Sequence, residues 1–189
     1  MRKNKIESKV NHQVLGNPIS SDLEILYSHL KDINFNGEII ELGCGDGHFV
    51  NQLNECGYQA IGTDVSLIEL EKAKLKYPKQ NFYIEDAETL SFENDSIDAF
   101  YMINVIQYVD RSKALNEIYR TLKPNGFLLI HFNLSIVASD GTIQNQNNKE
   151  DILTSVNNFR VIYTREYYRI DFQPKHHTHN ILELILTKK

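Results

Sequence analysis

The chain has 189 residues, of which 41% are hydrophobic and 10% aromatic. This length fits one domain with at most a short appendage, and the apolar content is enough for a sizeable core, which excludes a generally disordered chain. The 25 acidic residues outnumber the 20 basic ones and give a net charge of −5. A molecule with no basic field does not gather phosphate backbones, so we expect no general affinity for nucleic acid.

Cysteine content and hydropathy bear on the compartment. Cys44 and Cys56 are the only cysteines, too few for a disulfide scaffold and without the clustered spacing of a metal site. The sequence contains no run approaching the roughly 20 apolar residues of a membrane span, and no signal-peptide pattern. We therefore expect a cytoplasmic protein that does not associate with membranes.

The first residues predict an arm followed by a helix. Residues 1–20 are polar and end in Asn-Pro, which indicates a flexible N-terminal arm, whereas residues 21–189 are expected to form a single domain. Ser21 and Glu24 have the spacing of a capping box, and three leucines at helical spacing follow them. A first helix is therefore predicted to run to about Ile33.

From residue 38 onward, short β-type runs alternate with amphipathic helical patterns. This alternation predicts a parallel sheet with crossover helices. The predicted strands are 38–42, 58–63, 82–85, 97–103 and 127–132, and the predicted helices are 47–56, 66–77 and 112–122, the last ending at a turn over 123–126.

The C-terminal part shows a different pattern. The polar stretch 139–149 predicts a surface loop, and a short helix is expected near 151–156. Two further β-type runs, 159–168 and 181–186, are joined by about a dozen residues without a helical pattern, which suits an antiparallel pair rather than a crossover.

A glycine-rich segment marks the junction of the first strand and the helix that follows it. Residues 41–47 read Glu-Leu-Gly-Cys-Gly-Asp-Gly. In an open α/β sheet this junction binds ligands, and glycine removes the Cβ atoms that would keep a ligand away from the backbone. The third glycine comes one residue earlier than in the dinucleotide fingerprint, and Phe49 stands where that fold prefers a small residue, which disfavours a nicotinamide-dependent oxidoreductase. A glycine turn without a ligand is the alternative.

Three acidic residues accompany this segment. Asp64, at the end of the second strand and about 20 residues past Gly43, is placed to accept hydrogen bonds from ribose hydroxyls. Asp86 ends the third strand, where a carboxylate can accept an adenine amino hydrogen or simply cap a turn. Glu41 lies in an apolar strand, and a buried carboxylate needs a cationic partner such as a ligand's ammonium group.

Taken together, the chain from about residue 37 to its C-terminus resembles the class I S-adenosylmethionine-dependent methyltransferases. The resemblance implies an α/β, Rossmann-like, doubly wound sheet of seven mostly parallel strands with a C-terminal antiparallel hairpin and helices on both faces. It also implies a transferase that uses S-adenosyl-L-methionine and releases S-adenosyl-L-homocysteine. The segments that carry it are residues 41–47, 62–66, 85–87, 92–100 and 122–130.

The resemblance also implies roles for single residues. Glu41 would reach the methionine ammonium group, and the backbone of Gly43 and Gly45 would line the methionine and ribose. Asp64 would hold the ribose hydroxyls. The other implied contacts are Val65 packing on adenine, Asp86 and Ala87 at its polar edge, and Asn104, otherwise a simple turn residue, closing the pocket after the fourth strand.

Methyl transfer is an in-line displacement in which the protein mainly orients the reactants, so a catalytic base is optional. Tyr108 and His131 are candidate bases by position, although a buried strand histidine with a satisfied hydrogen bond is the simpler interpretation of His131. Gln107 stands where many family members carry acid and histidine, which leaves an inherited acid or base role open.

The acceptor is less well marked. Residues 103–108 contain none of the prolines typical of enzymes that methylate the amino groups of nucleic-acid bases, so we expect a small molecule or a peptide or carrier-bound acceptor. In this family, specificity comes from segments corresponding to residues 1–35 and 133–150. Both are short, so the pocket is either open or completed by a partner protein or a second copy. A non-catalytic interaction partner with this fold is the alternative.

Two further features have a functional and a simpler interpretation. His176, His177 and His179 suggest a metal site, but no acid or cysteine adjoins them in the sequence, so we favour a solvated loop and expect no metal. Cys44 precedes a helix, which can activate a thiol, but a small residue packed beneath the cofactor is the simpler interpretation.

Overall fold

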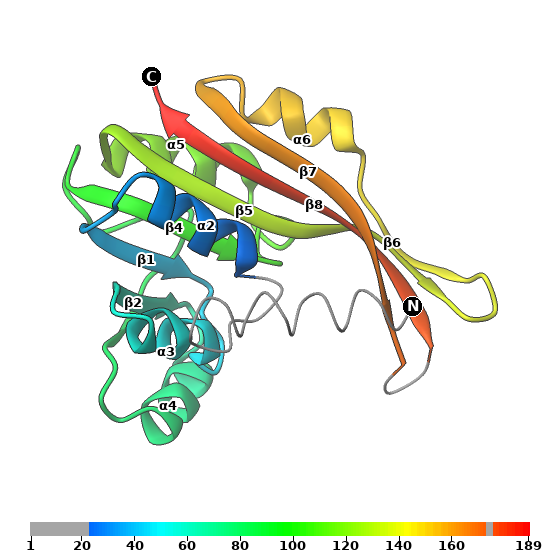
Figure 1. The fold of residues 1–189 in the computed structure, drawn as a ribbon, viewed down its shortest axis with the longest axis horizontal. Helices are drawn as coiled ribbons and strands as arrows, with labels where there is room; N and C mark the ends of the chain where they lie inside the picture. Colours follow the sequence, from blue (N-terminus) through cyan, green and yellow to red (C-terminus); the bar gives the residue numbers. More distant parts are fainter. Residues whose placement is uncertain (1–22, 173–175) are drawn as a thin grey trace.

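The computed structural model of the chain describes residues 23–172 and 176–189. The predicted arm over residues 1–20 and the predicted cap Ser21 lie outside this range. One twisted sheet runs through the molecule, with helices on both of its faces (Figure 1).

The sheet has the strand order β3-β2-β1-β4-β5-β8-β7, with β6 pairing with β5. Strands β1 to β5 are parallel to one another where they pair, whereas β8 is antiparallel to both β5 and β7. This confirms the predicted Rossmann-like sheet with a reversed C-terminal hairpin. The strands are β1 Glu38–Leu42, β2 Gln59–Asp64, β3 Phe82–Ile84, β4 Ile97–Ile103, β5 Leu122–Ala138, β6 Ile143–Gln146, β7 Phe159–Asp171 and β8 His177–Lys188.

Five helices of the described residues accompany the sheet, and none of them is long and apolar enough to cross a membrane. Ser66 caps the second crossover helix, because its hydroxyl accepts a 3.3 Å hydrogen bond from the Glu69 N–H. The first helix begins at Glu24. The helices are α2 Glu24–Asp32, α3 His48–Glu55, α4 Leu67–Lys76, α5 Arg111–Thr121 and α6 Lys149–Ser155.

The central strands are buried on both faces, as parallel strands covered by helices must be. Successive residues enter two separate apolar clusters because side chains alternate along a strand. Ile40, Phe100 and Leu128 belong to the cluster that includes residues of α5 and α6. Ile39 and Leu129 belong to the cluster that includes residues of α2, α3 and α4.

The C-terminal half departs from the prediction in its lengths. Residues 139–149 were expected to form a loop, but Ile143–Gln146 is strand β6 and pairs with the extended end of β5. The expected turn over 123–126 lies inside β5 as an irregularity in its pairing with β4. Strand β8 begins at His177, so the expectation of a solvated loop is wrong for His177 and His179, whereas His176 is exposed and lies outside the strand as expected. The polar segments at β6 and at the start of β8 form strands because pairing with β5 or β7 satisfies the hydrogen bonds of their backbone groups.

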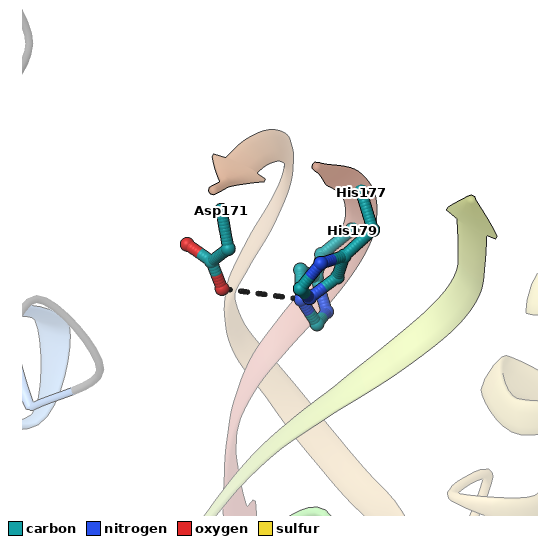
Figure 2. A group of neighbouring side chains, drawn as sticks. All are labelled: Asp171, His177 and His179. Carbon is teal, nitrogen blue, oxygen red and sulfur yellow. Dashed lines mark ion pairs between the residues drawn. The ribbon is translucent and has the colours of Figure 1, made fainter. Parts of the chain in front are cut away.

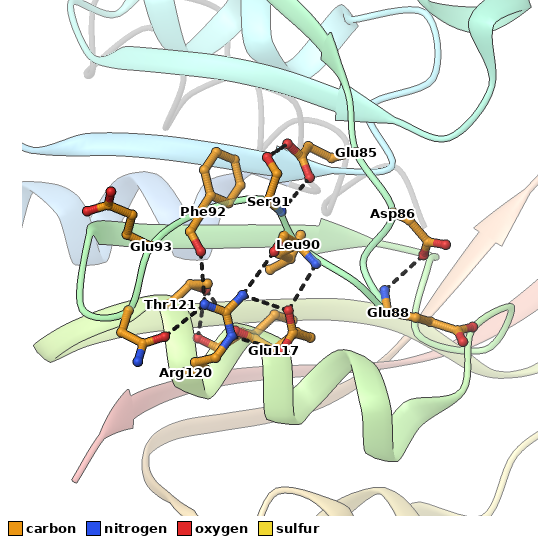
Figure 3. Close-up of polar contacts among 12 residues, drawn as sticks. Glu85, Asp86, Glu88, Leu90, Ser91, Phe92, Glu93, Glu117, Arg120 and Thr121 are labelled. Carbon is orange, nitrogen blue, oxygen red and sulfur yellow. Dashed lines mark hydrogen bonds and ion pairs between the residues drawn. The ribbon is translucent and has the colours of Figure 1, made fainter.

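Residues 85–96 connect β3 to β4 as a loop that α5 holds in place (Figure 3). The Arg120 guanidinium donates hydrogen bonds of 2.9 Å to the backbone oxygens of Leu90 and Phe92. It also pairs with Glu117 at 2.7 Å, and Glu117 accepts a 3.0 Å hydrogen bond from the Leu90 N–H. Two side chains of α5 thus fix the loop that follows the third strand.

This arrangement predicts the effect of removing the guanidinium. Arg120→Ala leaves two backbone oxygens without their donor, so we expect faster amide hydrogen exchange over residues 85–94, measured by mass spectrometry. Arg160→Ala, on the exposed side of β7, is the control and should leave exchange in this loop unchanged. Equal protection of the loop in both variants would contradict the proposed role of Arg120.

Candidate functional site

The glycine segment after β1 adopts a backbone that only glycine enters freely. Gly43, Gly45 and Gly47 have φ values of 72°, 50° and 76°. A Cβ on Gly47 would lie 2.4 Å from Cζ of buried Phe82, so packing also requires this glycine. A Cβ on Gly45 would meet no atom of the described chain within 4 Å. Gly45 therefore leaves backbone accessible on an open side of the loop.

Asp64, at the end of β2, fastens this loop. Its two carboxylate oxygens accept hydrogen bonds from the backbone N–H groups of Gly45, at 3.0 Å, and Ser66, at 2.9 Å. A carboxylate has about four lone-pair positions, so each oxygen retains capacity to accept a hydroxyl. The neighbouring Val65 is 63% exposed and offers an apolar surface beside the carboxylate.

Glu41 lies in β1, directly before the glycine segment, and is only 2% exposed. Burial raises the pKa of Glu41 well above its usual value; the Val50 backbone N–H lowers it, and the carboxylates of Asp46 and Asp64 raise it further. Among the described residues, its Oε2 atom has no hydrogen-bond partner. The site therefore contains a buried carboxylate that a cation would stabilise.

Backbone pairing between β2 and β3 positions Asp86 and Ala87, the residues predicted to contact adenine, close to Asp64. Ile84 is the register partner of Asp64, and the Glu85 N–H donates a 3.2 Å hydrogen bond to the Asp64 carbonyl, so Asp86 follows closely. The Asp86 carboxylate is exposed and caps a turn by accepting a 2.9 Å hydrogen bond from the Glu88 N–H (Figure 3). Ala87 is buried. The turn-cap contact is present, and binding of adenine by Asp86 stays a prediction.

Asn104 follows β4 in the left-handed conformation, with φ 54°. Its N–H donates a 2.7 Å hydrogen bond to the His131 carbonyl, and its side-chain oxygen accepts one of 2.9 Å from the Asn133 amide. Asn104 is thereby tied to β5 at the carboxyl end of the parallel strands. Its role in closing a cofactor pocket stays a prediction.

The two candidate bases lie in contrasting environments. Tyr108 is 82% exposed in the loop after β4. His131 is buried in β5, where Nδ1 lies 2.9 Å from an oxygen of buried Glu183 on β8. The other Glu183 oxygen accepts a 2.7 Å hydrogen bond from Arg165 on β7. These contacts give His131 the satisfied, buried environment of the simpler interpretation, and catalysis by either residue stays a prediction.

The structure favours the packing interpretation of Cys44. The side chain is 5% exposed, and its Sγ would lie 2.8 Å from a Cβ placed on Gly62. Burial raises the pKa of the Cys44 thiol strongly, and the neighbouring carboxylates of Glu41 and Asp64 raise it further. The thiol therefore stays protonated and is a poor nucleophile.

Sequence reasoning missed polar groups contributed by the antiparallel strands β5, β7 and β8. Glu183 interrupts the apolar run of β8, the same signal that identified Glu41. Asn133 and Asp171 gave no such signal, because polar residues near the ends of apolar runs are common.

The structure has a cavity of about 360 Å³ whose lining includes none of the predicted site residues. It includes Ile40, whose side chain belongs to the cluster on the α5 side of the sheet. Its lining residues are Glu38, Ile40, Ile61, Thr63, Tyr83, Ile84, Glu85 and Phe92.

The different surroundings of Gly45 and Gly47 predict different losses of stability when each is replaced by alanine. Gly45→Ala forces a left-handed conformation on alanine and should cost about 1–2 kcal/mol of unfolding free energy, measured in urea. Gly47→Ala adds the collision with Phe82 and should cost about 1–3 kcal/mol more. Gly57→Ala is the control for Gly45→Ala, with φ 89° and no described atom within 4 Å of its Cβ. A Gly47→Ala variant as stable as Gly57→Ala would contradict this account.

The buried Glu41 predicts a pH dependence of stability. Its pKa is raised in the folded state, so the folded protein holds the proton more tightly and stability falls as the pH rises from the unfolded value, about 4.3, through the raised pKa. Glu41→Gln should therefore be more stable than wild type at pH 7.5 but not at pH 4, measured by urea unfolding. Glu71→Gln, exposed on α4, is the control. A Glu41→Gln variant less stable than wild type at pH 7.5 would exclude an unpaired buried carboxylate.

Comparisons with known proteins agree with this geometry. Residues 40–130 match the family model described as a methyltransferase domain. A crystal structure of an S-adenosylmethionine-dependent methyltransferase from Methanosarcina mazei superposes with a TM-score of 0.73 at 20% identity, covering 87% of this chain and 97% of that one. At this identity the superposition shows the fold.

Curated relatives match over part of their length. An uncharacterised protein of Methanocaldococcus jannaschii is 29% identical over 144 residues, covering 69% of this chain and 58% of the relative. The malonyl-[acyl-carrier protein] O-methyltransferase of Pectobacterium atrosepticum is 27% identical over 92 residues, covering 48% of this chain and 36% of the relative. The chain thus spans roughly a third to just over a half of these relatives. The strand order, the glycine segment and the matched model agree: residues 40–130 are similar to the methyltransferase-domain family, and the chain has the fold of an S-adenosylmethionine-dependent methyltransferase.

Proposed function

We propose that this chain transfers a methyl group from S-adenosylmethionine to a small molecule, or to an acceptor carried on a peptide or carrier protein. The observation that carries the proposal is the buried Glu41 carboxylate, whose Oε2 lacks a partner among the described residues, directly before an open glycine segment. Glu41 lies near the carboxyl end of β1, the end of the parallel strands at which α/β sheets bind ligands. A cationic ligand group at this end would neutralise its carboxylate.

The residues present fit this cofactor. The methionine end of S-adenosylmethionine carries an ammonium group, which would neutralise Glu41. The open side of Gly45 would allow close approach to the backbone. Asp64 retains lone pairs for the ribose hydroxyls while it holds the loop. The ammonium group thus has a counterpart in Glu41, the ribose diol has one in Asp64, and Gly45 leaves room for the ligand beside the backbone.

When bound, S-adenosylmethionine supplies an activated methyl carbon, and S-adenosylhomocysteine is the product. The protein's part is to orient the reactants and exclude water. In the proposal, exposed Val65 packs on the adenine ring, Asp86 and Ala87 meet its polar edge, and Asn104 closes the pocket beyond β4. Asn104 is suited to this because β5 holds it on two sides, through His131 and Asn133.

The proposal assigns no catalytic base. In-line transfer needs one only when the acceptor must lose a proton, and then the base must lie within hydrogen-bond reach of that atom. Tyr108 is exposed and accessible to an acceptor, whereas His131 is buried against Glu183. Of the two candidates, Tyr108 is therefore the more accessible.

A small or carrier-bound acceptor is supported by the acidic net charge of −5, which repels nucleic acid, and by the similarity to a malonyl-[acyl-carrier protein] O-methyltransferase. We propose that the acceptor pocket is either open to solvent or completed by a partner protein or a second copy of the chain. The two cysteines are not joined in a disulfide, which supports the cytoplasm as the proposed working compartment.

Cofactor binding tests the first half of the proposal. Wild-type protein should bind S-adenosylmethionine in calorimetry, and Glu41→Gln should bind about 10- to 100-fold more weakly, because a charge-assisted hydrogen bond contributes about 1.5–3 kcal/mol. Gly45→Ala should also weaken binding, whereas Glu71→Gln and Gly57→Ala should not. No binding by the wild-type protein would overturn the proposal.

Transfer is tested with cofactor labelled in its methyl group. The labelled product should appear in a small-molecule or carrier-protein fraction and show a mass increase of one methyl. Label found only in RNA or DNA would overturn the acceptor class. Tight cofactor binding without transfer to any fraction would instead favour a non-catalytic interaction partner.

A further inference from the structure

Asp171, His177 and His179 lie together at the end of the hairpin formed by β7 and β8 (Figure 2). The register of the hairpin pairs Asp171 directly with His177, and His179 follows on the same face of β8 because side chains alternate along a strand. One potential ligand atom of each residue lies within 4.8 Å of the other two. Pairing between strands thus supplies the acidic neighbour that the sequence does not show beside the histidines.

We propose that these three residues bind one divalent transition-metal ion, with zinc as the ion to test first. Two imidazoles and one carboxylate form a donor set that suits zinc and its neighbours in the first transition series. Three protein ligands leave at least one coordination position for water or another ligand. The proposal concerns residues outside the predicted cofactor site and does not depend on methyl transfer.

The distances are close to those of a metal polyhedron. Zinc lies about 2.0–2.2 Å from nitrogen and oxygen ligands, so neighbouring ligands of a tetrahedral ion are about 3.4 Å apart. The Asp171 carboxylate oxygen and His179 Nε2 are separated by 3.2 Å. The ring centroids of His177 and His179 are 4.7 Å apart. The three ligand atoms lie within 4.8 Å of one another, and side-chain rotation would have to bring them to the spacing of a bound ion.

Hydrogen bonding orients His179 for this role. Its Nδ1 lies 2.7 Å from the side-chain oxygen of Asn133, and the Asn133 amide nitrogen donates a 2.9 Å hydrogen bond to Asn104. Because the Asn133 oxygen accepts only, Nδ1 carries the proton and the lone pair of a neutral ring lies on Nε2, toward Asp171. Histidines that bind metals are held by such an outer partner. The same asparagine connects this cluster to the end of β4.

Arg169 is the competing partner of the carboxylate. Its Nε lies 3.3 Å from the Asp171 oxygen that faces His179. Without metal, Arg169 and a protonated His179 can both pair with Asp171. Metal binding requires Asp171 to exchange the guanidinium contact for the ion or to bind through its other oxygen. Zinc affinity should fall at acidic pH, because imidazole and carboxylate groups bind a metal only when they are deprotonated.

The test measures zinc binding by the full chain without a histidine tag. In competition with a chromophoric chelator, we expect one zinc ion per chain. Asp171→Asn, His177→Gln and His179→Gln should each weaken binding at least about 10-fold, and Asn133→Ala should weaken it by about 10- to 100-fold. Cobalt in place of zinc should give visible absorption that these variants lose.

Matched controls separate this site from incidental binding. Asp140→Asn, at an exposed turn, and His29→Gln, on α2, remove the same group types elsewhere and should leave zinc affinity unchanged. Circular dichroism of each variant shows whether it folds, and Asp171→Asn, with a partly exposed side chain, keeps the test valid if His179→Gln does not fold. Absence of stoichiometric zinc binding, or equal binding by wild type and Asp171→Asn, would overturn the proposal.

Discussion

The buried carboxylate of Glu41 is the constraint on which the site depends. It lies in the central part of the sheet, next to β2 and β4, and the nearby acidic groups of Asp46 and Asp64 add to the cost of its negative charge. Burial of a charge with one oxygen left without a hydrogen bond among the described residues is unfavourable, and the proposed function assigns this carboxylate to the ammonium group of the cofactor. Within the adjoining glycine segment, Gly45 is the position where a Cβ would meet no described atom within 4 Å, which fits the close approach of a ligand in the proposed function.

The parallel and antiparallel parts of the sheet contribute different chemistry. Strands β1 to β4 end in the glycine segment, the carboxylates and Asn104, which together form the predicted cofactor side. The antiparallel strands β5, β8 and β7 contribute buried polar pairs, including His131 with Glu183 and Asn133 with His179. Asn133 joins the two parts because it contacts both His179 and Asn104. The hairpin of β7 and β8 therefore extends the sheet and also contributes buried polar side chains that contact β5.

Local sequence signals predicted the parallel part well. Strand β4 has the predicted bounds, and α3 and α4 differ by one residue at each end, because apolar runs and capping residues act within a few positions of each other. The same signals failed at β6 and at the start of β8. Those segments are polar, and they become strands because a neighbouring strand satisfies their backbone, which local patterns do not encode.

The sequence by itself determined where the parallel strands end, which glycines follow them, and that acidic residues stand at these ends. These features depend on residue type and spacing over short distances. Only the tertiary structure decided that Glu183 lies between His131 and Arg165, and that Asp171 faces two histidines of β8. Both arrangements follow from strand register, which is set by pairing between segments far apart in the chain and by the burial of whole faces.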